Sequence, residues 1–158
     1  FAKALLFPPA IEALGDRGAG LTSEVWWSPS HPFKSGLTGK SAKQVTEAYT
    51  AATGKQWTQP LGFKHANIEV AIDVLKRCGD PGDPNAILHA IENTNYNSLV
   101  GPISWKFGDH RNPVKNACRT PLVGGQWKRG KKFKYDLVIV NNKSAPEIPL
   151  GGDLDPLG

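Results

Sequence analysis

The middle of the chain places apolar residues at helical spacing. Over residues 41–53 the apolar side chains share one face, formed by Ala42, Val45, Tyr49 and Ala52. Ser41 and Gln44 have the spacing of a capping box, in which each side chain hydrogen-bonds the free backbone N–H of the other residue. Gly54 follows as a helix stop. This pattern predicts a helix over residues 41–53.

The next helical stretch, predicted over residues 63–78, is apolar on nearly every side, and Gly79 ends it. A helix of this kind must be covered on more than one side. It therefore indicates a partner structure larger than the neighbouring elements provide. Its apolar residues are Ala66, Ile68, Val70, Ala71, Ile72, Val74 and Leu75.

A third helix is predicted over residues 83–92, because Asp83 can cap it and Pro84 fits its first position. Residues 93–97 carry turn-forming side chains and end it. Near the start of the chain, apolar residues up to Leu14 resemble the end of a further helix, with Gly15 as its stop.

The last third of the chain has the alternation of β-strands. Residues 122–127 and 132–140 predict a hairpin around the turn 128–131, and residues 99–100 and 103–107 predict two short strands flanking Gly101 and Pro102. An earlier strand is predicted over 21–27, followed by a proline-rich loop. The pattern thus predicts an α/β protein, helices first and a β-rich C-terminal third afterwards.

Composition is that of an ordinary folded domain. The chain has 158 residues, of which 39% are hydrophobic and 21% charged, so it can bury a core and is not expected to be disordered. No apolar stretch reaches the roughly 18 residues that span a bilayer. The chain starts at Phe1 and contains no Met, which indicates a processed or trimmed chain.

The net charge of +5 raises the hypothesis of a basic nucleic-acid-binding module. Much of the excess lies close together, in Lys128, Arg129, Lys131, Lys132 and Lys134. A solvated hairpin tip explains this cluster more simply than a phosphate-binding patch. No zinc-ligand spacing or RNA-binding signature supports the nucleic-acid reading, so we predict no nucleic-acid partner.

Cys78 and Cys118 are the only cysteines. In an exported protein they could form a disulfide, since oxidising compartments preserve such bonds. Two separate buried thiols are the other interpretation, and spacing alone does not choose between them.

Nothing in the sequence indicates catalysis or a cofactor. The nucleophile, zinc-protease and phosphate-loop motifs are absent. Asp109 and His110 fit a polar turn better than an acid–base pair. His31, His89 and His110 are too scattered for a metal site. We therefore predict a non-enzymatic protein with no metal or cofactor.

An ordered set of motifs resembles type I periplasmic solute-binding proteins of ABC importers, closest to those for branched-chain amino acids and aromatic acids. The Gly-Pro-Ile strand at 101–103 and the Gly-Asp turn at 108–109 match family patterns, as does the helix ending in Tyr49 and Gly54. The remaining matches are GDRGAG at 15–20, the aromatic and apolar helix at 62–75, Gly-Gln-Trp at 125–127, the strand at 135–140 and Ile-Pro at 148–149.

The resemblance implies that residues 1–158 are the C-terminal portion of a two-lobed protein, with parts of both lobes and crossings near 27–33 and 141–150. Its function would be reversible capture of a small organic solute, such as a branched-chain amino acid or aromatic carboxylate. The partner would be a membrane permease, and the location periplasmic or extracellular. A ligand-sensing domain of a receptor or regulator with the same fold is the alternative.

In this family the ligand lies between the lobes, and hinge closure traps it. The resemblance places residues 60–63 at the cleft, so Phe63 is expected either to pack on the ligand or to belong to the core. His65 could hydrogen-bond an anionic ligand, although a structural role is more common for a lone His. The predicted ligand-binding residues are Phe63, Gly62, Trp26, Trp27 and His65.

Overall fold

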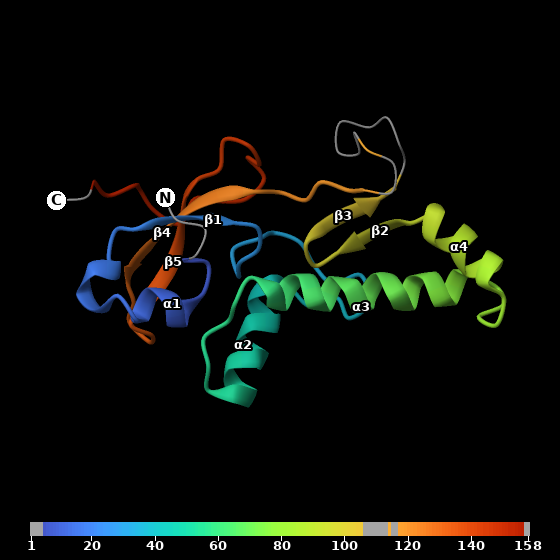
Figure 1. The fold of residues 1–158 in the computed structure, drawn as a ribbon, viewed down its shortest axis with the longest axis horizontal. Coiled ribbons are helices and arrows are strands. Elements are labelled where there is room, and N and C mark those ends of the chain that lie inside the picture. The colour runs from blue at the N-terminus through green and yellow to red at the C-terminus, as the bar shows by residue number, and fades with distance from the viewer. Residues whose placement is uncertain (1–4, 106–113, 115–116, 157–158) are drawn as a thin grey trace.

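The computed structural model describes residues 5–105, 114 and 117–156. These residues form two adjacent halves along the long axis of the molecule (Figure 1). The sheet half contains both termini of the described chain. The helical half consists of the continuous middle of the chain. Each half has its own buried apolar cluster.

The sheet half is built on three antiparallel strands in the order β1, β4, β5. These are β1 (Thr22–Val25), β4 (Val123–Arg129) and β5 (Tyr135–Asn141), and the short helix α1 (Pro8–Glu12) packs beside β5. The alternation predicted for the last strand is confirmed, because Tyr135, Leu137 and Ile139 are buried. Alternating residues thus fill the core of this half.

The helical half contains α2 (Ala42–Thr53), α3 (Pro60–Arg77) and α4 (Pro84–Glu92), with the hairpin β2 (Asn95–Ser98) and β3 (Gly101–Ser104). The capping box of α2 is present, and Gly54 ends that helix in the left-handed conformation. Asp83 caps α4 as predicted. Helix α3 begins three residues earlier than predicted, because Pro60 occupies its first turn.

The strands predicted on either side of Gly101 and Pro102 have the wrong bounds. Both residues lie within β3, and the turn is formed by Leu99 and Val100. The turn-forming run at 93–97 is largely strand, since Asn95 begins β2. Side-chain contacts outweigh local propensity here. The hydroxyl of Ser98 donates to the Gly101 carbonyl and accepts from the Val100 N–H, which closes the hairpin. Residues 106–107 of the predicted strand lie outside the described residues.

The basic cluster is at the tip of the β4–β5 hairpin, as predicted, although the turn itself comes later, between Arg129 and Tyr135. Two of its charges are paired. Lys128 lies 2.7 Å from Asp155, and Arg129 lies 3.1 Å from Asp16. These pairs reduce the positive potential of the tip.

The chain passes between the halves at residues 26–34 and again at 117–122 (Figure 1). Residues 141–150, predicted as a crossing, pack into the sheet half through Ala145 and Ile148. The passage at 117–122 is therefore the second one within this chain. How these segments serve as crossings in a complete two-lobed protein remains a prediction.

The loop between α2 and α3 ties the two halves together. Trp57 packs against both apolar clusters. Gln56 donates from Nε2 to the Tyr135 carbonyl at 2.8 Å, and Gln59 donates to the Glu24 carbonyl at 3.1 Å. Much of this connection is therefore made by side-chain amides on strand backbone.

Candidate functional site

An aromatic pair lies where the chain leaves the sheet half. Trp26 directly follows β1, and its backbone N–H donates to Gln59 Oε1 at 2.8 Å. Its ring meets the ring of Phe63, in the first turn of α3, edge to face, with centroids 5.1 Å apart and planes at 66°. Both side chains are half-buried. The pair therefore presents aromatic surface at the junction of the halves.

Trp27 and Gly62 belong to the core, which corrects their prediction as ligand contacts. Trp27 has no exposed surface, and its indole N–H donates to the Leu99 carbonyl at 3.1 Å. A Cβ on Gly62 would overlap the Trp27 ring. The two tryptophans lie just after the end of β1, where Trp26 is half-buried and Trp27 is fully buried. A glycine at 62 lets α3 approach that ring closely.

His65 lies apart from the aromatic pair. Two positions along a helix correspond to a rotation of about 200°, so His65 projects away from Phe63. Its Nε2 lies 3.2 Å from the Ser35 hydroxyl and 3.8 Å from Glu69 Oε1. Both partners fall on the same ring nitrogen, whereas a nucleophile relay needs the hydroxyl and the carboxylate on opposite nitrogens. The cluster therefore holds the 35–37 loop against α3.

Glu69 is 1% exposed and was not among the residues predicted for the site. Its two oxygens accept hydrogen bonds from the Leu99 N–H at 2.9 Å and the Leu37 N–H at 3.4 Å. Glu69 thus holds both the β2–β3 turn and the 35–37 loop against α3. Burial raises the pKa of nearby Tyr96, and the charges of Glu69 and Asp73 raise it further. A carboxylate flanked by Ile68 and Val70 was the signal in the sequence.

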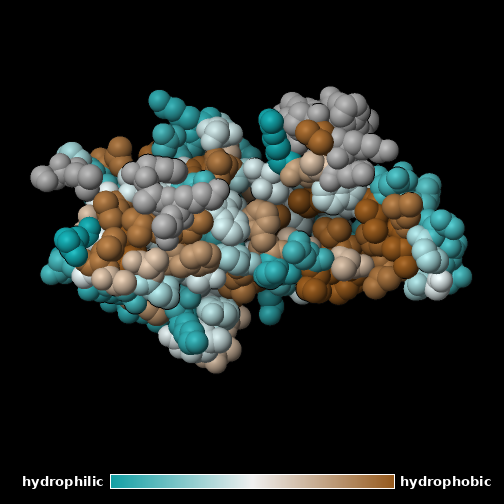
Figure 2. All heavy atoms as spheres, viewed as in Figure 1, coloured by the Kyte–Doolittle hydropathy of each residue, from teal (hydrophilic) through white to brown (hydrophobic). Residues whose placement is uncertain are grey.

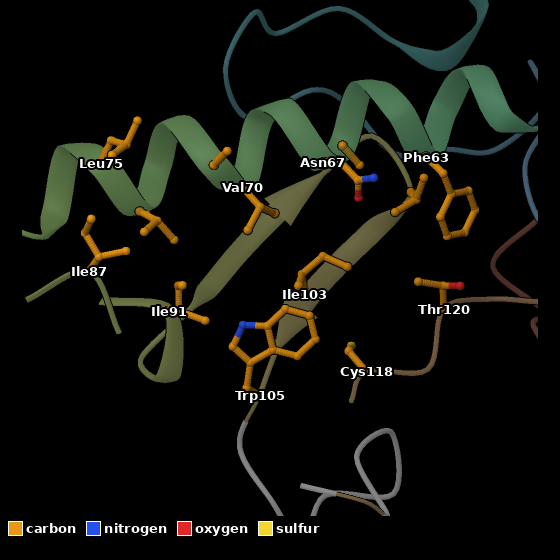
Figure 3. Close-up of a pocket in the computed structure, with 14 residues that line it drawn as sticks. Phe63, Asn67, Val70, Leu75, Ile87, Ile91, Ile103, Trp105, Cys118 and Thr120 are labelled. Atoms are coloured by element: carbon orange, nitrogen blue, oxygen red, sulfur yellow. The ribbon is translucent and has the colours of Figure 1, made fainter. Parts of the chain in front are cut away.

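A long apolar groove runs along α3 in the helical half. Figure 3 shows α3 along one side, with side chains of α4 and β3 and the 118–120 segment completing the walls. Its volume is about 610 Å³. Figure 2 shows hydrophobic surface gathered over α3 and α4. The groove, called the apolar groove below, is lined mainly by Phe63, Ala66, Val70, Val74, Leu75, Ile87, Ile91, Ile103, Trp105 and Cys118.

Cys78 and Cys118 are both free thiols in this structure, so the possible disulfide is not formed. Cys78 is the residue after α3 and its Sγ contacts the Leu75 carbonyl. Cys118 packs against the central cluster of the helical half, whereas Cys78 belongs to a separate small cluster with Val74 and Ala90. Their different surroundings keep the two thiols apart.

The histidines considered for a metal site form no cluster among the described residues. Within residues 5–105, 114 and 117–156, no three acidic, His or Cys side chains are placed to hold a metal ion. His31 is buried, and its Nδ1 accepts from the Ser28 N–H at 3.1 Å. Burial lowers the pKa of His31 to about 4, so it is neutral at pH 7. Asp109 and His110 lie outside the described residues.

Among the described helices, none has the length and apolar character needed to cross a membrane.

Comparison with known proteins gives matches at the level of fold. No protein-family model and no curated protein matches the sequence. An ABC transporter substrate-binding protein from Sphaerobacter thermophilus has a TM-score of 0.63 and 16% identity, covering 93% of this chain and 36% of that chain. A solute-binding protein of an ABC transporter from Rhodopseudomonas palustris, solved with 3,4-dihydroxybenzoic acid, gives 0.58 and 18%, with 90% and 36% covered.

A leucine-binding protein from Thermotoga maritima has a TM-score of 0.59 and 21% identity, covering 86% of this chain and 35% of that chain. The α/β fold predicted from the resemblance is therefore confirmed, as part of the fold of ABC transporter substrate-binding proteins. This chain spans about a third of the length of each of these structures.

Proposed function

We propose that this chain is part of an extracytoplasmic solute-binding protein that captures a small organic solute for an ABC importer. The observation that carries the proposal is the aromatic pair of Trp26 and Phe63 at the junction of two halves. The shared fold with substrate-binding proteins supports it. The chemistry is reversible binding without a covalent step.

The position of the pair suits a binding role. Trp26 stands at the start of the passage between the halves, and Phe63 stands at the start of α3. Solute sites are commonly concave, apolar and placed between structural units. Closing of one half toward the other would bring further groups against a ligand held by the pair, and this would trap it.

The chemistry of the pair favours a ligand with an apolar or aromatic part. Edge-to-face aromatic rings offer a broad apolar surface, onto which a branched aliphatic chain or another ring packs well. One structural neighbour is a leucine-binding protein, and another was solved with 3,4-dihydroxybenzoic acid. Both ligands have an apolar or aromatic part, as proposed here. We propose a branched-chain amino acid or an aromatic carboxylate, delivered to a membrane permease from the periplasmic or extracellular side.

The first experiment isolates the protein from its own source and records its intact mass. Isothermal titration with leucine and with 3,4-dihydroxybenzoate follows. We expect one of the two to bind, and Trp26→Ala or Phe63→Ala to weaken its affinity by roughly 10- to 100-fold, because each removes a large aromatic contact.

Phe133→Ala is the matched control, since Phe133 lies at the hairpin tip of the sheet half, outside the pair, and its loss should leave the affinity unchanged. Equal affinities of the wild type and both pair variants would contradict the assigned site. Absence of binding by either compound would contradict the proposed ligand class.

A further inference from the structure

The turn between β4 and β5 concentrates positive charge at one end of the sheet half. Residues 128–136 contain five cationic side chains and a single carboxylate, that of Asp136. Two of the cations are paired, with Asp155 and Asp16. Among the described residues, no carboxylate lies within ion-pair distance of the other three cations, which are exposed. They are called the lysine tip below: Lys131, Lys132 and Lys134.

The backbone holds the lysine tip in a tight turn. The Gly130 N–H donates to the Lys134 carbonyl at 3.1 Å, and a Cβ at position 130 would lie 2.4 Å from the Phe133 carbonyl oxygen. The chain therefore reverses within a few residues and keeps the three lysines at the end of the hairpin. Like charges that are close together repel one another. A partner that supplies negative charge relieves this repulsion.

Aromatic side chains accompany these charges. Phe133 is half-buried, and the Lys132 ammonium lies 5.7 Å from the centre of its ring. The Lys134 ammonium lies 5.9 Å from the centre of the Tyr135 ring. Lysine stems can cover apolar surface while their charged heads stay in water. A charged layer with an aromatic ring beside it suits the boundary between lipid headgroups and acyl chains.

The setting of the hairpin favours a lipid surface over nucleic acid. A β-ribbon that reads DNA enters the major groove, and binders of single strands stack successive bases on aromatic rings. Here β4 is enclosed between β1 and β5, so the hairpin is no free ribbon. The lysine tip also has one half-buried ring, Phe133, rather than a row of rings. A membrane requires no matching groove, and its attraction grows with the number of lysines near its surface.

The lysine tip lies well away from the candidate solute site. Strand β4 begins just after the second passage between the halves and runs from Val123 to Arg129. At the rise of an extended strand, its far end is about 20 Å from that passage. Figure 1 shows the β4–β5 turn beside α1, at the end of the sheet half. The aromatic pair and the apolar groove are therefore left free when the tip is occupied.

We propose that the lysine tip binds the surface of a membrane that contains anionic phospholipids. The inference rests on the proposed extracytoplasmic role, since the permease of an importer lies in a membrane, but it does not depend on the identity of the solute. Binding at the tip raises the concentration of the protein near the permease and leaves the junction of the halves open to solute.

The test measures sedimentation of the protein, isolated from its own source, with vesicles of phosphatidylglycerol and phosphatidylcholine in equal parts. Vesicles of phosphatidylcholine alone are the comparison. We expect binding to the anionic vesicles only. Raising the salt concentration from about 0.1 M to about 1 M should abolish it, because the screening length falls from about 10 Å to about 3 Å. Absence of binding to the anionic vesicles at low salt would overturn the proposal.

A triple variant tests the lysine tip itself. Lys131→Gln, Lys132→Gln and Lys134→Gln together should weaken binding to the anionic vesicles roughly 100-fold, at about 5-fold for each lysine near the surface. The matched control makes the same change in net charge at three exposed lysines of the helical half and should keep most of the binding. It combines Lys40→Gln, Lys55→Gln and Lys76→Gln. Equal losses in the two triple variants would overturn the proposal, because the attraction would then follow net charge alone.

Two further measurements identify the partner and separate this inference from the proposed solute binding. Tighter binding to duplex DNA or to polyglutamate than to the anionic vesicles, at the same salt concentration, would overturn the assignment to lipid. Titration with leucine and 3,4-dihydroxybenzoate should give the same affinities for the tip variant and the wild type. A protein that binds solute but not vesicles would overturn the lipid inference alone, whereas binding to vesicles without solute binding would support it and contradict only the proposed ligand class.

Discussion

Gly62 lies against the face of the Trp27 indole, so closely that the ring occupies the space of any side chain at position 62. This contact brings the first turn of α3 to the core of the helical half. Trp27 in turn meets Trp57 edge to face at 6.2 Å and donates to the Leu99 carbonyl. One glycine thus sets the distance between α3 and Trp27, at the start of the first passage between the halves.

We expect Gly62→Ala to destabilise the protein by about 3 kcal/mol, the upper range for overpacking a filled core. Urea unfolding followed by tryptophan fluorescence measures this loss. Lys64→Ala, on the exposed side of the same turn, is the matched control and should change the free energy of unfolding by less than about 0.5 kcal/mol. Similar stabilities of the two variants would show that α3 can shift away from Trp27 at little cost.

Glu69 should be the most sensitive polar residue of α3. Glu69→Ala leaves the Leu99 and Leu37 N–H groups without their acceptor, so we expect a loss of about 2–4 kcal/mol in the free energy of unfolding. Glu69→Gln keeps an acceptor oxygen and should lose less. Glu47→Ala removes only an exposed pair with Lys43 and should cost under about 0.5 kcal/mol. A Glu69→Ala loss as small as that of Glu47→Ala would argue against the anchoring role.

His31 should make stability depend on acid pH. Its pKa is lowered to about 4 in the folded chain by burial, from 6.5. The unfolded chain therefore takes up this proton below about pH 6.5, whereas the folded chain resists until about pH 4. Stability from neutral His31 is thus fully present above pH 6.5 and is lost as the pH falls toward 4, by about 3 kcal/mol in total.

His31→Gln removes the titrating group, so its free energy of unfolding should fall less steeply over this range than that of the wild type. Urea melts at pH 7.5, 6, 5 and 4 measure the difference. Parallel curves for the two proteins would show that His31 is protonated without cost in the folded state.

Gln126 should hold the C-terminal segment on the sheet half. It is 1% exposed, and its amide pairs with the Asp155 backbone at both N–H and carbonyl while also donating to the Gly20 carbonyl. We expect Gln126→Ala to release residues 151–156, seen as faster hydrogen exchange of that segment. Lys128→Ala removes the Lys128 side-chain contacts with Asp153 and Asp155, which lie nearer the surface, and should accelerate exchange much less. Equal acceleration of exchange in both variants would show that Gln126 anchors the segment no more than Lys128 does.

Much of the fold could be predicted where local chemistry decides the structure. The capping box at Ser41 and the glycine at 54 fix α2 without help from other elements. The β2–β3 hairpin could not be predicted from its own residues, because its turn is held by a contact distant in sequence: Glu69, thirty residues earlier, accepts from the Leu99 N–H. A contact between segments distant in sequence outweighs local preference there.

The candidate site was predictable in its residue types and less so in their directions. The sequence predicts Phe63 and Trp26 as ligand contacts, and the structure brings their rings together. The sequence also indicates their neighbours Gly62 and Trp27, but in the structure Gly62 packs against the ring of Trp27, which is fully buried in the core. Which of two consecutive residues faces the junction depends on the strand and helix phases, and α3 begins earlier than the sequence pattern suggested.

The pairing of β1 with β4 has a consequence for the order of folding. Val25 lies opposite Val123, with the whole helical half between them in the chain. Closing a flexible loop of roughly a hundred residues costs about 4 kcal/mol in chain entropy. If the helical half forms first through its local helices and hairpin, the ends of that loop are already close. We therefore expect the three-stranded sheet to be completed last. Its rate of formation would be limited by the folding of the helical half, which separates β1 from β4 in the chain.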